Sequence, residues 1–215
     1  MPLQNRVTPE GEIIATPERG MVMGNRGGRI HRDDRSLGRV RWKSKAWITC
    51  RLAFKGRHRT VMGSSYTELF FLDEATALAA GHRPCFECRR ADALAYQAAW
   101  AEAADLAAPP RAAEMDRALH AERCAVAGRD ALPEVRPTAL PDGAVVLDRE
   151  GAWLVLHGTA RLWSPGGYGM SRPLGGFGLV RLLTPPSTVA VLRHGYRPAV
   201  HDSIGVALAG GGGRP

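Results

Sequence analysis

The sequence predicts an α+β fold in which a small module, made of a β-hairpin and helices, precedes a mainly β C-terminal domain. Residues 40–62 alternate and are rich in Trp, Ile, Thr and Phe, which is typical of strands. Residues 74–124 contain alanine-rich segments, which favour helices. Beyond residue 141, short apolar runs are separated by glycine-rich turns, as in antiparallel sheets.

The N-terminal part is expected to contain little regular structure. Residues 1–20 have one short apolar run, at 13–15, and therefore at most one brief strand. The glycine-rich stretch at 20–39 indicates a flexible basic loop. Strands are predicted near 46–54 and 57–62, with Lys55 and Gly56 forming a hairpin turn between them.

Helices are predicted for the middle of the chain. Asp73 is a good N-cap and Gly81 a good C-terminal stop for a helix over 74–80. A longer helix is expected from about 90 to 107, where two consecutive prolines end it, and another over roughly 111–124.

The C-terminal part is predicted to be mainly β. Apolar runs at 144–147 and 153–156 flank a polar turn and indicate a β-hairpin. A further strand is expected at 179–183, a short helix at 188–194, and a disordered tail at 210–215.

These elements predict five segments along the chain. They are a basic glycine-rich arm (1–39), the hairpin-and-helix module (40–108), a helical connector (109–141), a β-rich domain (142–205) and a disordered tail (206–215).

Basic residues are concentrated at the start of the chain. Residues 1–62 hold 14 Lys and Arg against 5 Asp and Glu, whereas the remainder holds 15 against 16, for a net charge of +8. Such asymmetry indicates a polyanionic partner, most simply a nucleic acid and in particular DNA, although a solvated basic surface is the alternative. The candidate contacts are Arg26, Arg29, Arg39, Arg41, Lys43 and Arg57.

The cellular setting is read from two features. No apolar run approaches the length of a membrane span, and the N-terminus lacks the apolar core of a secretory signal, so we expect a cytoplasmic protein with no membrane partner. Four cysteines in a reducing compartment indicate metal ligands, catalytic groups or buried apolar residues rather than disulfides.

Three of the cysteines form a candidate zinc site. Cys85 and Cys88 have the Cys-x-x-Cys spacing in a loop between two helical segments, and the short turn brings both sulfurs to one side. Cys50, in the predicted strand, supplies a third ligand from a distant part of the chain. The candidates for the fourth ligand are His58, His82, His120, Cys124 and water, and the sequence does not decide among them. The register of the predicted hairpin argues against His58.

The surroundings of these cysteines carry a family resemblance. An aromatic pair (Phe70 and Phe71) and an alanine-rich helical segment lead to the run AGHRPC at residues 80–85. Two residues later comes CR at 88–89, and the run TCR lies upstream at 49–51. On these motifs residues 46–92, less than a quarter of the chain, resemble the N-terminal zinc-binding domain of Ada-type DNA-repair proteins. The resemblance implies four zinc-bound cysteines, of which the first, here Cys50, accepts a methyl group from a DNA methylphosphotriester. This chain has Phe54 where that family has its second cysteine.

His120 and Glu122 are candidate catalytic residues. Their His-Ala-Glu run resembles half of the zinc-deaminase signature, but it follows the Cys-x-x-Cys pair instead of preceding it. Asp116 lies one helical turn before His120 and is placed to orient its imidazole, whereas the alternative is a solvent-facing helix with loose ion pairs.

The predicted function is therefore a zinc protein that contacts DNA through its Arg-rich N-terminal region, possible roles being repair or modification. Whether it is an enzyme stays open at this point. One alternative is a zinc-dependent hydrolase or group-transfer enzyme that acts on a nucleic acid or nucleotide with His120 and Glu122. A second is a non-enzymatic interaction protein whose zinc is purely structural.

Overall fold

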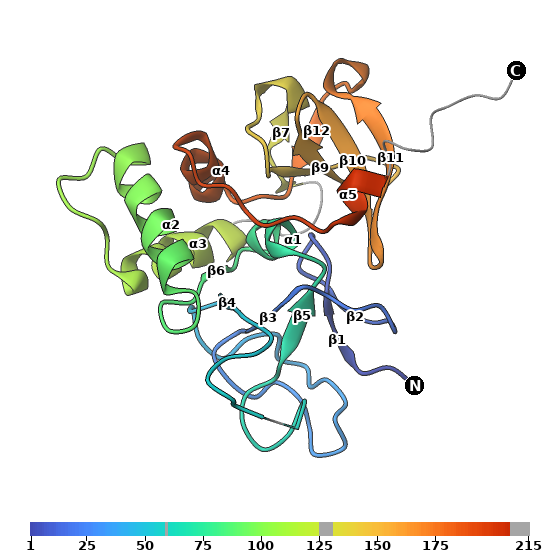
Figure 1. Ribbon diagram of the computed structural model, residues 1–215, viewed down its shortest axis with the longest axis vertical. Helices are drawn as coiled ribbons and strands as arrows, with labels where there is room; N and C mark the ends of the chain where they lie inside the picture. Colours follow the sequence, from blue (N-terminus) through green and yellow to red (C-terminus); the bar gives the residue numbers. More distant parts are fainter. Residues whose placement is uncertain (59, 125–130, 207–215) are drawn as a thin grey trace, which may run out of the picture.

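The structure is a computed structural model that describes residues 1–58, 60–124 and 131–206. The described residues form two six-stranded sheets and five α-helices, which confirms the predicted α+β class (Figure 1). None of the described helices is both long and apolar enough to cross a membrane.

The first sheet brings together the N-terminal residues and the cysteine-bearing segments. Its strands run in the order β2-β1-β5-β3-β4-β6. They are β1 (Gln4–Val7), β2 (Ile13–Ala15), β3 (Val22–Asn25), β4 (Ile48–Cys50), β5 (Leu69–Phe71) and β6 (Arg83–Pro84).

Residues 1–39, all of which the structure describes, contain three strands where at most one was predicted. Gly24, in the stretch interpreted as a loop, is the point where β3 and β4 approach each other closely. A Cβ atom there would lie 2.3 Å from the carbonyl oxygen of Ile48. Glycine lowers strand propensity but permits this contact, which explains why a local reading of the sequence missed the strand.

The predicted hairpin between 46–54 and 57–62 is wrong. Lys55 and Gly56 do form a turn, with φ angles of 51° and 63°. However, β4 pairs with β3 and β6 instead, and the described residues of 57–62 form no strand. Lys55 and Gly56 form the turn that their residue types predict, but the strand before them pairs with strands elsewhere in the chain.

The second sheet is antiparallel in all five pairings of its described strands, which have the order β11-β10-β9-β8-β12-β7. Its strands are β7 (Glu134–Val135), β8 (Val145–Leu147), β9 (Ala152–Leu156), β10 (Thr159–Ser164), β11 (Gly167–Pro173) and β12 (Val180–Leu182). The β8–β9 hairpin and β12 were predicted, whereas the β10–β11 hairpin was not, because the glycines at positions 166, 167 and 169 weaken the local strand signal.

Five helices complete the fold. They are α1 (Glu74–Ala79), α2 (Arg90–Ala103), α3 (Ala112–Cys124), α4 (Pro186–Arg193) and α5 (Ser203–Val206). The predicted cap and stop of α1 are confirmed, since the Asp73 carboxylate accepts a hydrogen bond from the Thr76 amide and Gly81 has a φ of 79°. The predicted tail lies outside the described residues, apart from the last residue of α5.

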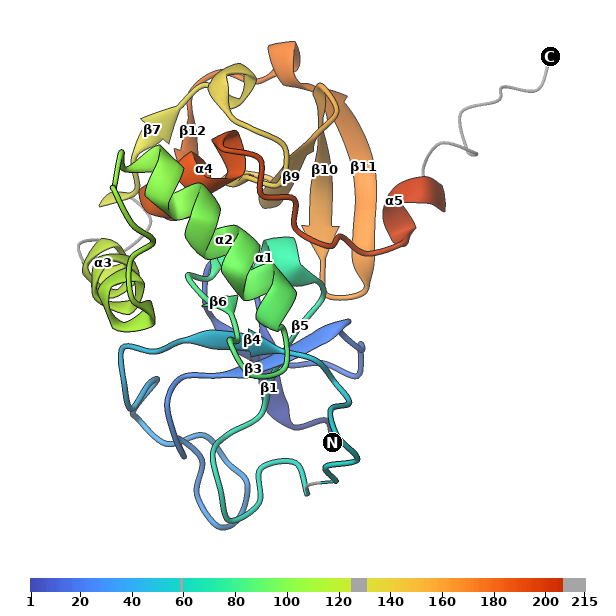
Figure 2. The same cartoon turned by 60° about the vertical axis from the view of Figure 1, so that its left-hand side comes forward.

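Helix α1 lies between the two sheets (Figures 1 and 2). All six of its residues are buried. Ala77 packs in the core of the first sheet, whereas Ala75 and Ala79 pack in a cluster with strands of the second. The alanine content of this helix therefore reflects its position, because small side chains let two sheets pack on one helix. The division into independently folding domains stays a prediction.

Candidate metal centre

The thiols of Cys50, Cys85 and Cys88 lie within 4.8 Å of one another. Tetrahedral Zn–S bonds of about 2.3 Å place two sulfurs about 3.8 Å apart, so the separation is close to that of a metal-bound set. Cys85 and Cys88 are buried, each 9% exposed, whereas Cys50 is half-buried. The structure therefore forms a possible metal site from the three cysteines singled out in the sequence.

Backbone pairing between β4 and β6 brings the distant cysteines together. Thr49 and Pro84 are partners in this parallel pair, and the amide of Cys85 donates to the Thr49 carbonyl over 2.9 Å. The Cys-x-x-Cys loop is closed by a bond from the Arg89 amide to the Cys85 carbonyl, of 3.0 Å. Cys50 directly follows Thr49 and Cys85 directly follows Pro84, so the pairing of Thr49 with Pro84 brings these two cysteines together.

Arg89 adds a second connection between the two cysteine segments. Its Nη1 donates to the Thr49 hydroxyl over 2.9 Å, next to Cys50. Its Nη2 pairs with the carboxylate of Glu74 at 2.8 Å, and its Nε donates to Asp92 at 2.8 Å. Because Arg89 follows Cys88 directly, this buried guanidinium holds both sides of the site in one geometry.

The three thiols differ in pKa. A hydrogen bond from the Cys50 thiol lowers the pKa of Cys85 to about 5, and backbone amides of Cys88 and Glu87 act in the same direction against burial. Donating that bond, together with burial, raises the pKa of Cys50, and burial raises the pKa of Cys88. Without a metal the cluster therefore carries one thiolate at neutral pH.

No histidine or carboxylate joins the three thiols among the residues that the structure describes. His58 is exposed. His82 is fully buried beneath Trp47 and Phe71, with ring centroids 5.0 and 4.7 Å away. His120 packs edge-on against Trp42 at 4.7 Å. The side chain of Cys124 lies outside the described part, so the fourth ligand is not assigned to any described residue.

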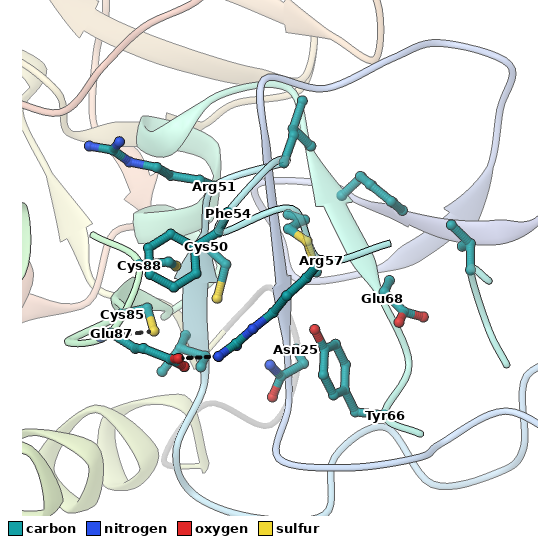
Figure 3. A pocket seen from close by; sticks show the side chains of 15 residues that line it. Asn25, Cys50, Arg51, Phe54, Arg57, Tyr66, Glu68, Cys85, Glu87 and Cys88 are labelled. Atoms are coloured by element: carbon teal, nitrogen blue, oxygen red, sulfur yellow. Dashed lines mark hydrogen bonds and ion pairs between the residues drawn. The ribbon is translucent and has the colours of Figure 1, made fainter. Parts of the chain in front are cut away.

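The cysteines form one wall of a pocket of about 370 Å³ (Figure 3). Arg57 extends across this pocket and pairs with Glu87 at 2.6 Å. The aromatic rings of Phe54, Tyr66 and Phe70 and the carboxylate of Glu68 also line it. The accessible cysteine thus faces a cavity that has both apolar and charged walls.

Glu68, which the sequence did not single out, is buried in this wall with 3% of its surface exposed. Its Oε2 accepts from the backbone amide of Met62 over 2.8 Å. Its Oε1 has no hydrogen-bond partner among the described residues. Local sequence signals could show at most that positions 66, 68 and 70 share one face of a strand, and not that a pocket lies there.

His120 and Glu122 lie on α3 and do not belong to the cysteine cluster. Glu122 accepts hydrogen bonds from the amide and hydroxyl of Ser187 at the start of α4. The predicted role of Asp116 is corrected, because both of its oxygens accept from Arg83 at 2.8 Å in a buried ion pair. A catalytic role for His120 and Glu122 stays a prediction.

Arg26 is not a surface contact for a nucleic acid, which corrects one of the predicted residues. It is 2% exposed, stacks on Trp47 at 3.9 Å and donates to the Gly11 carbonyl over 3.0 Å. Arg123 covers Trp47 at 4.0 Å. Burial, and then the charge of Arg123, lowers the pKa of Arg26 to about 9. This arginine therefore belongs to the packing of the protein interior.

The other predicted basic residues lie nearer to the solvent. Arg29 pairs with Asp33 and is half-buried. Arg57 is exposed at the pocket. The remaining three are exposed on the segment between β3 and β4; they are Arg39, Arg41 and Lys43.

Comparison of the chain with protein-family models, with curated proteins and with solved structures found no match.

Proposed function

We propose that Cys50, Cys85 and Cys88 bind one zinc ion and that the pocket beside them receives part of a DNA molecule. The protein would then be a zinc-dependent DNA-binding protein that acts in repair or modification. The observation that carries this proposal is that the cysteine cluster forms a wall of a pocket instead of lying sealed in a core. Sulfur donors in this number and spacing suit zinc.

The basic residues near the pocket support an anionic partner. Arg51 and Arg57 both line it, and both are exposed. Arg57 is paired with Glu87, whose carboxylate is more than half exposed. A surface pair of this kind has little net free energy, so a phosphate can compete with Glu87 for the guanidinium at small cost.

The ligand set favours chemistry at sulfur. Three thiolates on a divalent ion leave a net charge of −1, which keeps the sulfurs nucleophilic and makes the ion a weaker Lewis acid than in sites with neutral ligands. Cys50 is the most exposed of the three, so it is the sulfur that a substrate reaches first. In the methyl transfer implied by the Ada resemblance, the Cys50 sulfur attacks the methyl carbon. The carbon–oxygen bond breaks, and the phosphodiester oxygen leaves with the electron pair.

Three measurements test the proposal. Elemental analysis should find one zinc per wild-type chain, and less than one in Cys85→Ser, with Arg149→Gln, in an exposed turn of the second sheet, as the control. Fluorescence anisotropy should show DNA binding that weakens steeply with salt. Incubation with methylphosphotriester DNA should add one methyl group to Cys50, located by peptide mass spectrometry. A zinc-loaded protein that binds no DNA at low salt would contradict the proposal.

A second candidate function is zinc-dependent hydrolysis of a nucleic acid or nucleotide. It is favoured by the lack of a fourth side-chain ligand among the described residues, since an open position is typical of catalytic zinc. Multiple turnover of a phosphodiester or nucleotide substrate, lost on zinc removal and in Glu122→Ala, would support this candidate. Single turnover with a methylated Cys50 would support the first.

A further inference from the structure

We infer that the open face of the first sheet binds single-stranded DNA, and that Glu68 recognises a base carrying an amino group in the pocket beside the cysteines. This inference rests on the proposed function and specifies the substrate class of that site.

The first observation is a row of residues in register across the sheet. Phe70 is paired with Arg6 on one side and with Met23 on the other, and Met23 is paired with Cys50. Paired residues point to the same face of a sheet, so these four side chains form one line across β1, β5, β3 and β4. All four are half-buried.

The opposite face is covered by the protein core. Residues adjacent to the row, among them Val7, Val22 and Phe71, are buried in one apolar cluster that also contains Ala77 of α1. The sheet therefore has one face closed by α1 and one face on which the row from Arg6 to Cys50 stays accessible. Cys50 lies at the end of this accessible row.

Two cavities adjoin along the row. The pocket at the cysteines and a second cavity of about 410 Å³ share Leu52, Val61 and Phe70 in their walls. The second cavity is also lined by Arg6 and Arg19. Together they form a groove that runs from the metal site, past Phe70, to the outer strands of the sheet.

The groove combines positive charge with aromatic surface. Arginines line both of its ends: Arg51 and Arg57 near the cysteines, and Arg6 and Arg19 in the second cavity. Phe70 lies where the two cavities meet, and the Arg6 guanidinium stacks on its ring at 4.8 Å. Alternation of phosphate-binding cations with stacking rings is what an unpaired DNA strand requires.

Glu68 supplies the recognition element. Glu68 lines the pocket, and its Oε1 has less than 1 Å² of accessible surface and no partner among the described residues, which is costly for an acceptor. A rotation of this side chain toward the cavity would bring the oxygen to a ligand and pair it. A carboxylate oxygen accepts but cannot donate, so the ligand atom facing it must carry a hydrogen. The exocyclic amino groups of cytosine, adenine and guanine satisfy this requirement. Thymine offers one donor, its ring N3–H, but that donor lies between two carbonyl oxygens that the carboxylate repels, so an amino-bearing base is favoured over thymine.

The walls of the pocket favour a base that has left the duplex stack. Residues 52, 54, 57 and 61, from the segment after β4, line it together with sheet residues. In Figure 3 the Arg57 side chain crosses it between the cysteines and the side that carries Tyr66 and Glu68. A base inserts between these two walls most readily from a single strand or after leaving the stack.

The test compares single-stranded and duplex DNA on the zinc-loaded, full-length protein. Anisotropy is measured with a labelled oligothymidylate, with the same oligomer carrying one central dC, and with the corresponding duplexes. We expect tighter binding of the single strands and an increase of about tenfold in affinity on introducing dC. Arg6→Gln should weaken binding of every strand and reduce its salt dependence, whereas the matched control Arg149→Gln, in the exposed turn after β8, should not.

Glu68→Gln provides a sharper result. The amide oxygen would stay on the Met62 amide, which puts the NH₂ group in the place of Oε1 and converts an acceptor into a donor. The preference for dC over dT should then be lost or inverted while general binding persists. If Glu68→Gln fails to fold, the wild-type comparison of dC with dT still decides.

Tighter binding of duplex than of single strands, or equal wild-type affinity for the dC and dT oligomers, would overturn this inference and leave the proposed function standing. Absence of binding to any DNA would overturn both.

Discussion

Replacement of Arg89 by methionine tests whether the metal site is held by the contacts described above. The guanidinium is 6% exposed and pairs with Glu74, which is 1% exposed. Removing one partner of a buried ion pair typically costs about 3–5 kcal/mol of unfolding free energy, because the other charge stays buried. Glu74 keeps two other donors, the Tyr196 hydroxyl at 2.6 Å and the Ala199 amide at 3.0 Å. We therefore expect a cost at the lower end, about 3 kcal/mol.

The contact of Arg89 with Asp92 adds little to this figure, because that carboxylate is 40% exposed and its pair is screened by water. The contact of Arg89 with Thr49 is expected to affect the affinity for the metal instead of the free energy of unfolding. It connects the residue before Cys50 to the residue after Cys88, and loss of such an outer contact typically lowers metal affinity about 10–100-fold.

Urea unfolding of the zinc-free protein measures the first effect, and competition with a chelator measures the second. Arg90→Met is the matched control, because Arg90 is adjacent and exposed. Glu74→Gln in a double-mutant cycle should recover part of the loss, since no unpaired charge is then left. If the free energy of unfolding of Arg89→Met lies within about 0.5 kcal/mol of the wild-type value and its zinc affinity is unchanged, Arg89 does not hold the site.

Three further predictions follow from burial and protonation. Burial holds the pKa of His82 well below its ordinary 6.5, so below that pH the unfolded chain binds a proton that the folded chain excludes. The free energy of unfolding therefore falls as pH decreases below 6.5, by up to about 1.4 kcal/mol per pH unit. In urea unfolding of the zinc-free protein, His82→Gln should remove this pH dependence. An unchanged pH dependence would contradict the assignment to His82. Zinc binding near pH 7 should release about two protons, because the thiolate of Cys85 is already formed while Cys50 and Cys88 keep their protons. Calorimetry in buffers of different ionisation enthalpy measures this number, and a release near three would show that no thiolate exists beforehand. Finally, removal of zinc by a chelator should lower the unfolding temperature. The free energy of unfolding should fall by about 4 kcal/mol when free zinc had been 1,000-fold above its Kd. An equal unfolding temperature would show that zinc does not connect the two cysteine segments.

Local signals in the sequence predicted much of the secondary structure and the three cysteines. The Cys-x-x-Cys spacing acts over a few residues, and the N-cap at Asp73 and the stop at Gly81 depend only on neighbours. Such features can be read without knowing the rest of the fold. Cys50 lies in a run of strand-forming residues, and β4 confirms the strand.

Features that depend on pairing between distant strands could not be predicted in the same way. One of the two partners of β4 is β3, which lies in a glycine-containing stretch predicted to be a loop. The register that aligns Cys50 with Phe70 and Arg6 passes through that strand. The carboxylate of Glu68 acquires its significance only from the pocket that this register creates. Burial of Arg26 has the same origin, because the charge of a residue does not reveal which side of a strand faces the core.

The bonds from Tyr196 and Ala199 to Glu74 have a consequence for the order in which the protein matures on the ribosome. Synthesis proceeds from the N-terminus, so all three cysteines emerge more than one hundred residues before these two donors. Until the donors emerge, the carboxylate that anchors Arg89 lacks two of its partners. If the cysteine cluster binds zinc as proposed, a nascent chain can capture the ion early, but the contacts that hold Arg89 beside the cluster are completed only when almost the whole protein has been made.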